Sequence, residues 1–250
     1  MKPRTRFVLI TLATVLGMAT TASLGRWQLN RAAEKEARQA SVDAQSNKQL
    51  VDTSLLMVTA DPTTLVHRHA LLRGQWLGDQ TLYLDNRQMH DKVGFFAVTP
   101  LRLEGSDHVI LVQRGWVQRN FEEREKVPAI ETPSGNVTLE GRIAPPPGKL
   151  FELGTPSLGP IRQNLDISQM QAQRRAQGNA PLLPVLLVQT GAPSEGLVRD
   201  WPAVNLGVEK HYGYALQWFG MAALMAVLYL WYQFLRPYFQ RNKDYKPHAQ

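Results

Sequence analysis

The sequence predicts a membrane protein in which two transmembrane helices flank a β-rich extracytoplasmic domain, an antiparallel barrel- or sandwich-like sheet with short helices. Three observations predict this fold. Two apolar stretches without a charged side chain, residues 7–25 and 212–235, stand near the two ends of the 250-residue chain. Basic residues precede the first stretch and follow the second. Between them, apolar residues recur with the period of two that is typical of half-buried strands.

The second apolar stretch is the clearer candidate span. At 1.5 Å per residue it is long enough to cross a hydrocarbon core of about 30 Å. Amphipathic rings prefer the headgroup level, and aromatic residues gather near both of its ends: Tyr212, Tyr214, Trp218, Tyr229, Trp231 and Tyr232. Basic residues then follow, as expected of a cytoplasmic end: Arg236, Arg241, Lys243 and Lys246.

The first apolar stretch has two interpretations. Lys2, Arg4 and Arg6 precede it, and small residues near Ala19 resemble a signal-peptide cleavage region. Its length is also near the lower limit for a membrane span. If it is retained, the expected boundaries are two cytoplasmic segments (1–6 and 236–250), two spans (7–25 and 211–235) and an external domain (26–210). The polar segment as far as about Gln49 is expected to continue the first helix out of the membrane.

The middle region reads as a series of strands separated by turns. A short helix is expected over Asp166–Gly178, with Asp166 as its N-cap and Gly178 as its stop signal. The turn at 104–107 predicts an antiparallel hairpin over 93–118, and 77–80 is expected to close the strand pair before it. The predicted strands are 69–76, 81–88, 93–103, 108–118, 137–144 and 184–190.

Composition and motifs exclude several classes of function. The net charge of +7 is partly explained by the basic flanks of the two apolar stretches. No zinc-finger spacing or basic helix indicates nucleic-acid binding. The absence of cysteine removes thiolate nucleophiles and Cys-based metal sites. No Gly-x-Ser-x-Gly, His-Glu-x-x-His or phosphate-binding glycine loop is present, so the chain is not expected to be an enzyme.

Histidines are the main candidates for chemistry. His67 and His69 have strand spacing and would face one side of a strand, but no third metal ligand is evident, and a solvated strand edge explains them as well. Ser106, Asp107 and His108 include the residue types of a triad without its geometry, because they are neighbours on a turn.

His211 is distinguished by its position at the outer edge of a span. Tyr214, Ala215 and Trp218 follow at helical spacing on one face. Neutral imidazole is a common axial ligand of haem iron, and flat aromatic neighbours suit a flat ring. The alternative, which the residues alone leave open, is an interfacial histidine among interfacial aromatics.

Several short motifs together resemble those of the Surfeit locus protein 1 family of cytochrome c oxidase assembly factors, in particular its bacterial members. They occur in the family's order and extend from the first span to the second. Gln113 and Tyr212 depart from the family's usual Asn and Leu, and residues 150–203 match least. The matching pieces are Gly25-Arg26-Trp27-Gln28, Gly74-Gln75-Trp76, Asn86-Arg87, Gly94-Phe95, Thr99-Pro100-Leu101, Leu111–Val117, Gly141-Arg142-Ile143 and Asn205–Phe219.

The resemblance implies a non-enzymatic protein of the bacterial inner membrane, with two uncleaved spans, both termini in the cytoplasm and the main domain in the periplasm. It implies a role in building the haem a centre of oxidase subunit I. A histidine at the start of the second helix is associated with haem a binding in bacterial members, and that position matches His211. Tyr214 and Trp218 would shape the pocket, with haem a synthase as a candidate partner and membrane lipid as the surroundings.

Arg26, at the outer end of the first span, is expected either to face a haem propionate or to extend to the lipid interface.

Two other functions compete with that of a chaperone that binds haem a and delivers it to subunit I. One is a scaffold that stabilises an oxidase assembly intermediate without binding a cofactor. The other is a periplasmic enzyme or copper-delivery factor, which the lack of cysteine and of a Met-x-x-Met cluster disfavours.

Overall fold

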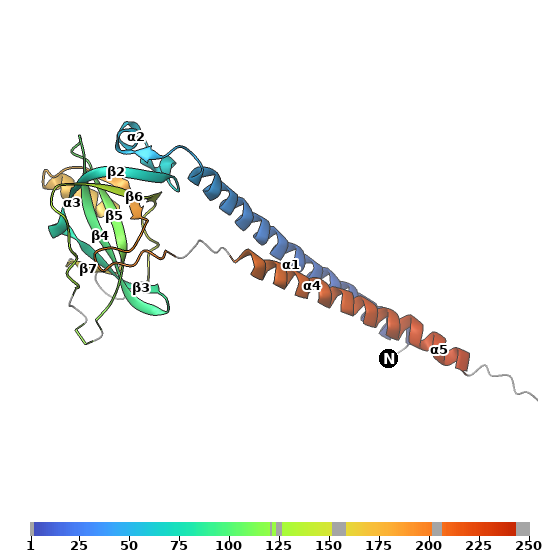
Figure 1. Cartoon of the computed structure of the whole chain (residues 1–250). Coiled ribbons are helices and arrows are strands. Elements are labelled where there is room, and N and C mark those ends of the chain that lie inside the picture. Colours follow the sequence, from blue (N-terminus) through green and yellow to red (C-terminus); the bar gives the residue numbers. More distant parts are fainter. Residues whose placement is uncertain (1–2, 121, 124–126, 152–158, 202–206, 244–250) are drawn as a thin grey trace, which may run out of the picture. The chain divides into compact units, whose positions relative to one another are not determined.

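The chain divides into two compact units in this computed structural model (Figure 1). Residues 1–40 and 204–250 form the helical unit, and residues 41–203 form the sheet unit. The structure describes residues 3–120, 122–123, 127–151, 159–201 and 207–243.

Two long helices make up the helical unit. Helix α1 extends from Pro3 to Ser46, and α4 from Val208 to Leu230 is continued by a π-helical turn, η3 (Trp231–Leu235), and by α5 (Arg236–Lys243). The prediction that the first helix continues beyond its apolar stretch is confirmed. Neither helix buries its most apolar 18-residue window inside the protein, unlike the core helix of a soluble domain. Both helices are therefore compatible with membrane anchoring.

The helices lie antiparallel, and small residues allow their close contact. Thr11 Oγ1 lies 2.8 Å from Tyr229 Oη, and a Cβ added to Gly17 would lie 3.1 Å from Met225 Sδ. The small residue Gly17 of the first helix therefore lies at a point of contact with the second helix.

Every strand predicted in the sheet unit is present, with shifts of one or two residues at the ends. The short helix α3 (Ile167–Ala176) is also confirmed, because the Asp166 carboxylate caps it by accepting from the Gln169 amide at 2.9 Å. The main strands are β2 (His69–Trp76), β3 (Leu82–Met89), β4 (Lys92–Leu103), β5 (Val109–Gln118), β6 (Asn136–Ala144) and β8 (Leu182–Gln189). The smaller elements are β1 (Val51–Asp52), α2 (Thr53–Val58), η1 (Pro62–Leu65), η2 (Gly78–Gln80) and β7 (Ile161–Arg162).

The sheet is mixed, so the prediction of a purely antiparallel sheet is wrong. Strand β8 runs parallel to β5, and β1 and β7 pair parallel to β2 and β3. Strand β5 is buried along nearly its whole length, which is typical of a strand covered on both faces. The pairings β2–β6, β6–β8, β8–β5, β5–β4 and β4–β2 link five strands in a closed cycle.

The hairpin over 93–118 is confirmed by the antiparallel β4–β5 pair, but residues 77–80 do not join a paired hairpin. Strand β2 pairs with β1, β4 and β6 instead of β3. The cause is the length of β4, whose first half pairs with β3 while its end pairs with β2. The 3₁₀ turn η2 therefore carries the chain along one edge of β4 rather than back on itself.

Two apolar clusters fill the sheet unit. The first lies under α2 and η1 and contains Leu56, Leu72 and Ile110. The second, around α3, contains Leu111 and Leu186. Strand β5 supplies both clusters from its two faces, since Ile110 and Leu111 point to opposite sides of a strand.

Three of the short motifs meet at one point of the sheet unit. Trp116 is buried, and its indole N–H donates to the carbonyl of Arg87 at 2.8 Å. A Cβ added to Gly94 would lie 2.6 Å from the Trp116 ring, so the indole needs a glycine beneath it. These residues serve the fold of the sheet unit.

Candidate functional site

His211 is the fourth residue of α4, which begins after the N-cap Gly207, whose φ of 61° suits glycine. Its imidazole is half-buried in the helical unit. The Nδ1 atom lies 2.6 Å from Oε1 of Gln28, a residue of α1 that is far away in the sequence. The two helices are therefore joined by a polar contact at this end of the pair.

Gln28 is buried at this contact, with 9% of its surface exposed. Gly25 and Ala32 lie on the same face of α1 at i−3 and i+4, and both are buried. A Cβ at Gly25 would lie 2.8–3.0 Å from the Phe219 ring, so the helices could not approach as closely with a larger residue. On α4, Ala215 is 2% exposed one turn after His211. Small residues thus bring the glutamine and the histidine within reach.

The contact determines which imidazole nitrogen carries the proton. An amide oxygen only accepts hydrogen bonds, so Nδ1 of His211 must be the donor. In the neutral imidazole the lone pair then lies on Nε2. Among the described residues, Nε2 has no hydrogen-bond partner. The arrangement is that of a metal-ligating histidine, whose other nitrogen usually donates to a protein oxygen.

The other predicted site residues lie at different distances from this contact. Trp218 is half-buried and Tyr214 is 51% exposed, at i+7 and i+3 from His211 on one flank of α4. Arg26 is exposed and two residues before Gln28, so it projects from α1 about 200° around the helix from the glutamine. The structure therefore groups Tyr214 and Trp218 with His211, and places Arg26 on another face of α1.

The remaining described histidines do not form a site with His211. The strand interpretation of His67 is wrong, because its φ of 75° lies in the left-handed region and β2 begins only at His69. His90 is exposed and pairs with Asp200 at 2.6 Å. His108 contacts Ser106 Oγ at 3.0 Å within one turn. No group of three or more His, Asp or Glu capable of holding a metal ion occurs in the part of the chain that the structure describes.

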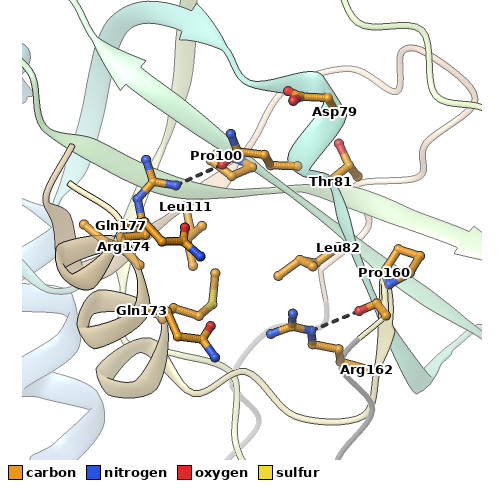
Figure 2. Close-up of a pocket in the computed structure, with 14 residues that line it drawn as sticks. Asp79, Thr81, Leu82, Pro100, Leu111, Pro160, Arg162, Gln173, Arg174 and Gln177 are labelled. Carbon is orange, nitrogen blue, oxygen red and sulfur yellow. Dashed lines mark hydrogen bonds between the residues drawn. The ribbon is translucent and has the colours of Figure 1, made fainter. Parts of the chain in front are cut away.

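The sheet unit contains a separate cavity of about 460 Å³, shown in Figure 2. Arg174 and Gln177, at the end of α3, lie across this cavity from Arg162. Arg174 donates to Gln80 Oε1 at 2.9 Å and to the Ala180 carbonyl at 3.0 Å. Burial, and then the neighbouring Arg102, lowers the pKa of Arg174. The floor is apolar, formed by Leu82, Leu111, Met170 and Leu182.

The chain matches the model of the SURF1 family over residues 15–223. The chain belongs to the SURF1 family. This family generally comprises assembly factors of cytochrome c oxidase. The chain is 28% identical to a SURF1-like protein of Drosophila melanogaster, over 86% of this chain and 74% of the relative. It is 26% identical to a SURF1-like protein of Rickettsia felis, over 92% of this chain and 97% of the relative.

Both members of the helix contact, Gln28 and His211, lie inside the residues that match the family model. Gln28 was not predicted as a site residue, although it stands in the Gly25–Gln28 motif. The available signal was a polar amide just after an apolar stretch, with a small residue three positions before it, Gly25, and another four positions after it, Ala32. The cavity beside Arg174 had no signal in the sequence, because its residues come from distant segments.

Proposed function

We propose that this chain is a non-enzymatic assembly factor of cytochrome c oxidase that binds haem a through His211 and presents it to subunit I. In this proposal α1 and α4 cross the bacterial inner membrane, both termini are cytoplasmic and the sheet unit is periplasmic. The observation that carries the proposal is the partly buried contact of Gln28 with His211. It leaves Nε2 of a half-buried imidazole with its lone pair at the end of an apolar helix pair.

The residues present fit a haem as cargo. A haem needs one imidazole from the protein, whereas a bare metal ion needs three or four ligands. Tyr214 and Trp218 offer flat aromatic surfaces on one flank of the ligand. Leu216, which is 76% exposed, provides an apolar surface for the lipophilic tail of haem a. When bound, the haem would supply the iron that His211 ligates.

Each residue of the chain has a limited task in this proposal. Gln28 holds the imidazole in the tautomer with a free Nε2, and Gly25 keeps the helices close. A single protein ligand suits a carrier, because a second one would make release to subunit I harder. Haem a synthase is the candidate donor of the cargo. A role of Arg26 as the partner of a haem propionate stays a prediction, which haem a binding by Arg26→Gln would test.

The test measures haem a bound to the purified full chain. The protein is isolated in mild detergent from cells that make haem a, and its haem is extracted and quantified per protein. His211→Ala is expected to retain less than about a tenth of the native haem, because the iron loses its protein ligand. His69→Ala, which removes an exposed histidine of the sheet unit, is the matched control and should retain all of it.

Each other outcome changes the proposal. Equal haem on the native chain and on His211→Ala would place the ligand elsewhere. No haem a on a well-folded native chain would overturn the carrier and favour a scaffold that stabilises an oxidase intermediate without a cofactor. Restoration of haem binding to His211→Gly by added imidazole would show that the lost ligand, rather than a misfolded helix pair, causes the defect.

A further inference from the structure

A groove of about 840 Å³ lies between the helices at the end of the pair opposite to His211. The residues of α1 that line it recur every three or four positions, from Pro3 through Arg6 and Phe7 to Thr14. Its other wall comes from the end of α4, η3 and the start of α5. The apolar and aromatic lining residues are Phe7, Ile10, Met225, Leu228, Tyr229 and Tyr232, and the polar ones include Arg6, Gln233 and Arg236.

The charge of this groove is unbalanced. Arg6 and Arg236 both line it, from the two different helices. The sequence contains no Asp or Glu between residues 1 and 33 or between residues 210 and 243. The nearest acidic residue along the chain, Asp244, lies outside the described residues. The two exposed guanidinium groups are therefore available to an anion, and the described residues that line the groove include no acidic one.

A buried donor in the same groove also lacks a partner. The amide Nε2 of Gln233 is buried and has no acceptor within the described residues. A buried N–H₂ group without an acceptor is costly, so Gln233 Nε2 needs an acceptor from outside the described residues, either water or a ligand. Phosphate and ester oxygens are acceptors of this kind.

The local backbone explains how Gln233 comes to lie there. Pro237 has no N–H, and its ring would clash with the carbonyl of residue 233 in a regular helix. The chain relieves this conflict with the π turn η3, in which the Arg236 amide donates to the Trp231 carbonyl instead. The guanidinium of Arg236 lies 5.8 Å from the centroid of the Tyr232 ring, and both residues line the groove.

We infer that this groove binds one anionic phospholipid. Its phosphate lies between Arg6 and Arg236, a headgroup or ester oxygen accepts from Gln233, and an acyl chain follows Phe7 and Leu228. Basic pockets between membrane helices on the cytoplasmic side are typical sites for anionic lipids. This inference rests on the membrane setting proposed above, but not on haem binding.

The test uses the full chain purified in mild detergent and exposed to equal amounts of phosphatidylglycerol and phosphatidylcholine. After removal of excess lipid, native mass spectrometry counts each lipid retained per protein. The native chain is expected to retain phosphatidylglycerol several-fold over phosphatidylcholine. Arg6→Gln and Arg236→Gln should each weaken that retention about fivefold, since one arginine near the surface contributes about a factor of that size.

Arg4→Gln is the matched control, because it removes one positive charge from the same end of α1 but lies outside the groove. It should leave the retention of phosphatidylglycerol unchanged, and Arg6→Lys should keep most of it. An equal loss from Arg4→Gln and Arg6→Gln would overturn the inference, since general surface attraction would then explain the binding. Equal retention of the two lipids would also overturn it.

Haem a is quantified on the same preparations. The groove variants should keep native haem, and His211→Ala should keep native phosphatidylglycerol, because the two sites lie at opposite ends of the helix pair. A native chain that retains phosphatidylglycerol without haem would sink the proposed carrier and leave the lipid site standing. A chain that binds haem but no phosphatidylglycerol would overturn the lipid site and leave the proposed carrier standing.

Discussion

Arg114 of the sheet unit and His211 of the helical unit differ in how accessible their polar atoms are. In the sheet unit, Arg114 is 1% exposed, and its terminal nitrogens donate to Thr132 Oγ1 and to the Glu131 carbonyl, both at 2.8 Å. Its guanidinium also lies 4.6 Å from the Trp76 ring. In the helical unit, the partly buried pair of Gln28 and His211 leaves one imidazole nitrogen without a partner among the described residues.

The difference separates structural motifs from the functional one. The Arg-Gly-Trp strand end resembles a functional signature because it joins a charge to an aromatic residue. In the structure, the terminal nitrogens of Arg114 donate to Thr132 and to the Glu131 carbonyl, the Trp116 N–H donates to a backbone carbonyl, and Arg114 Nε is buried without a partner among the described residues. A site that receives a ligand must keep some bonding capacity open. The unpaired Nε of Arg114 is closed to a ligand because Arg114 is 1% exposed, whereas the open nitrogen of His211 belongs to a half-buried imidazole.

The largest expected effect is on the stability of the sheet unit. Arg114→Leu should lower the stability of the sheet unit by about 3 kcal/mol, or roughly 6–12 °C in Tm, because it leaves Thr132 Oγ1 and the Glu131 carbonyl without the guanidinium that donates to them. Thermal unfolding of the full chain in detergent, followed by tryptophan fluorescence, measures it. Haem a per folded protein should stay at the native level, since Arg114 belongs to the other unit.

Arg102→Leu is the control for this change, because Arg102 is an exposed arginine on the neighbouring strand β4. Its Tm should lie within about 2 °C of native, as surface substitutions usually change stability by less than 0.5 kcal/mol. A native Tm for Arg114→Leu would contradict the structural role assigned to Arg114.

The next largest expected effect is on the binding of haem a by the helical unit. Gln28→Leu should weaken haem a binding about 10- to 100-fold, because the imidazole loses the acceptor that fixes its tautomer and orientation. Gln28→Glu should keep binding and lower the midpoint potential of the bound haem, since a carboxylate acceptor makes the imidazole a stronger donor to iron. Haem titration and redox titration of the purified protein measure the two quantities.

Gln217→Leu is the matched control, because Gln217 is an exposed glutamine on α4. Helix packing alone would not predict a change of potential in Gln28→Glu, so this readout separates a positioning role from a structural one. Unchanged affinity in Gln28→Leu would remove Gln28 from the site and leave His211 to be oriented by other residues.

The sequence predicted local features well and pairings poorly, for a physical reason. Strands such as β2 follow from alternation along a few residues, and α3 follows from the Asp166 cap. The parallel contact of β8 with β5 is non-local, and no periodicity within either strand encodes it. Gln28 was missed because polar residues after an apolar stretch are usually exposed, and only the partner helix shows why this one is buried.

The smallest expected effect concerns His67, whose strand interpretation failed. Partial burial, and then the charge of Arg142, lowers the pKa of His67 below its usual value of about 6.5. The unfolded chain therefore binds more protons at this position, so the folded state loses stability as the pH falls below about 6.5. Above that value the contribution of His67 is fully present.

Replacing His67 should remove this part of the acid sensitivity. Asn tolerates the left-handed conformation that the φ of 75° requires, so His67→Asn keeps the backbone, including the amide that donates to the Ile143 carbonyl at 2.8 Å. The fall in Tm between pH 7 and pH 5 should be smaller in His67→Asn than in the native chain. His69→Asn, at an exposed position two residues later, should show the native fall. An identical fall in all three proteins would mean that His67 binds a proton equally well in the folded and unfolded states.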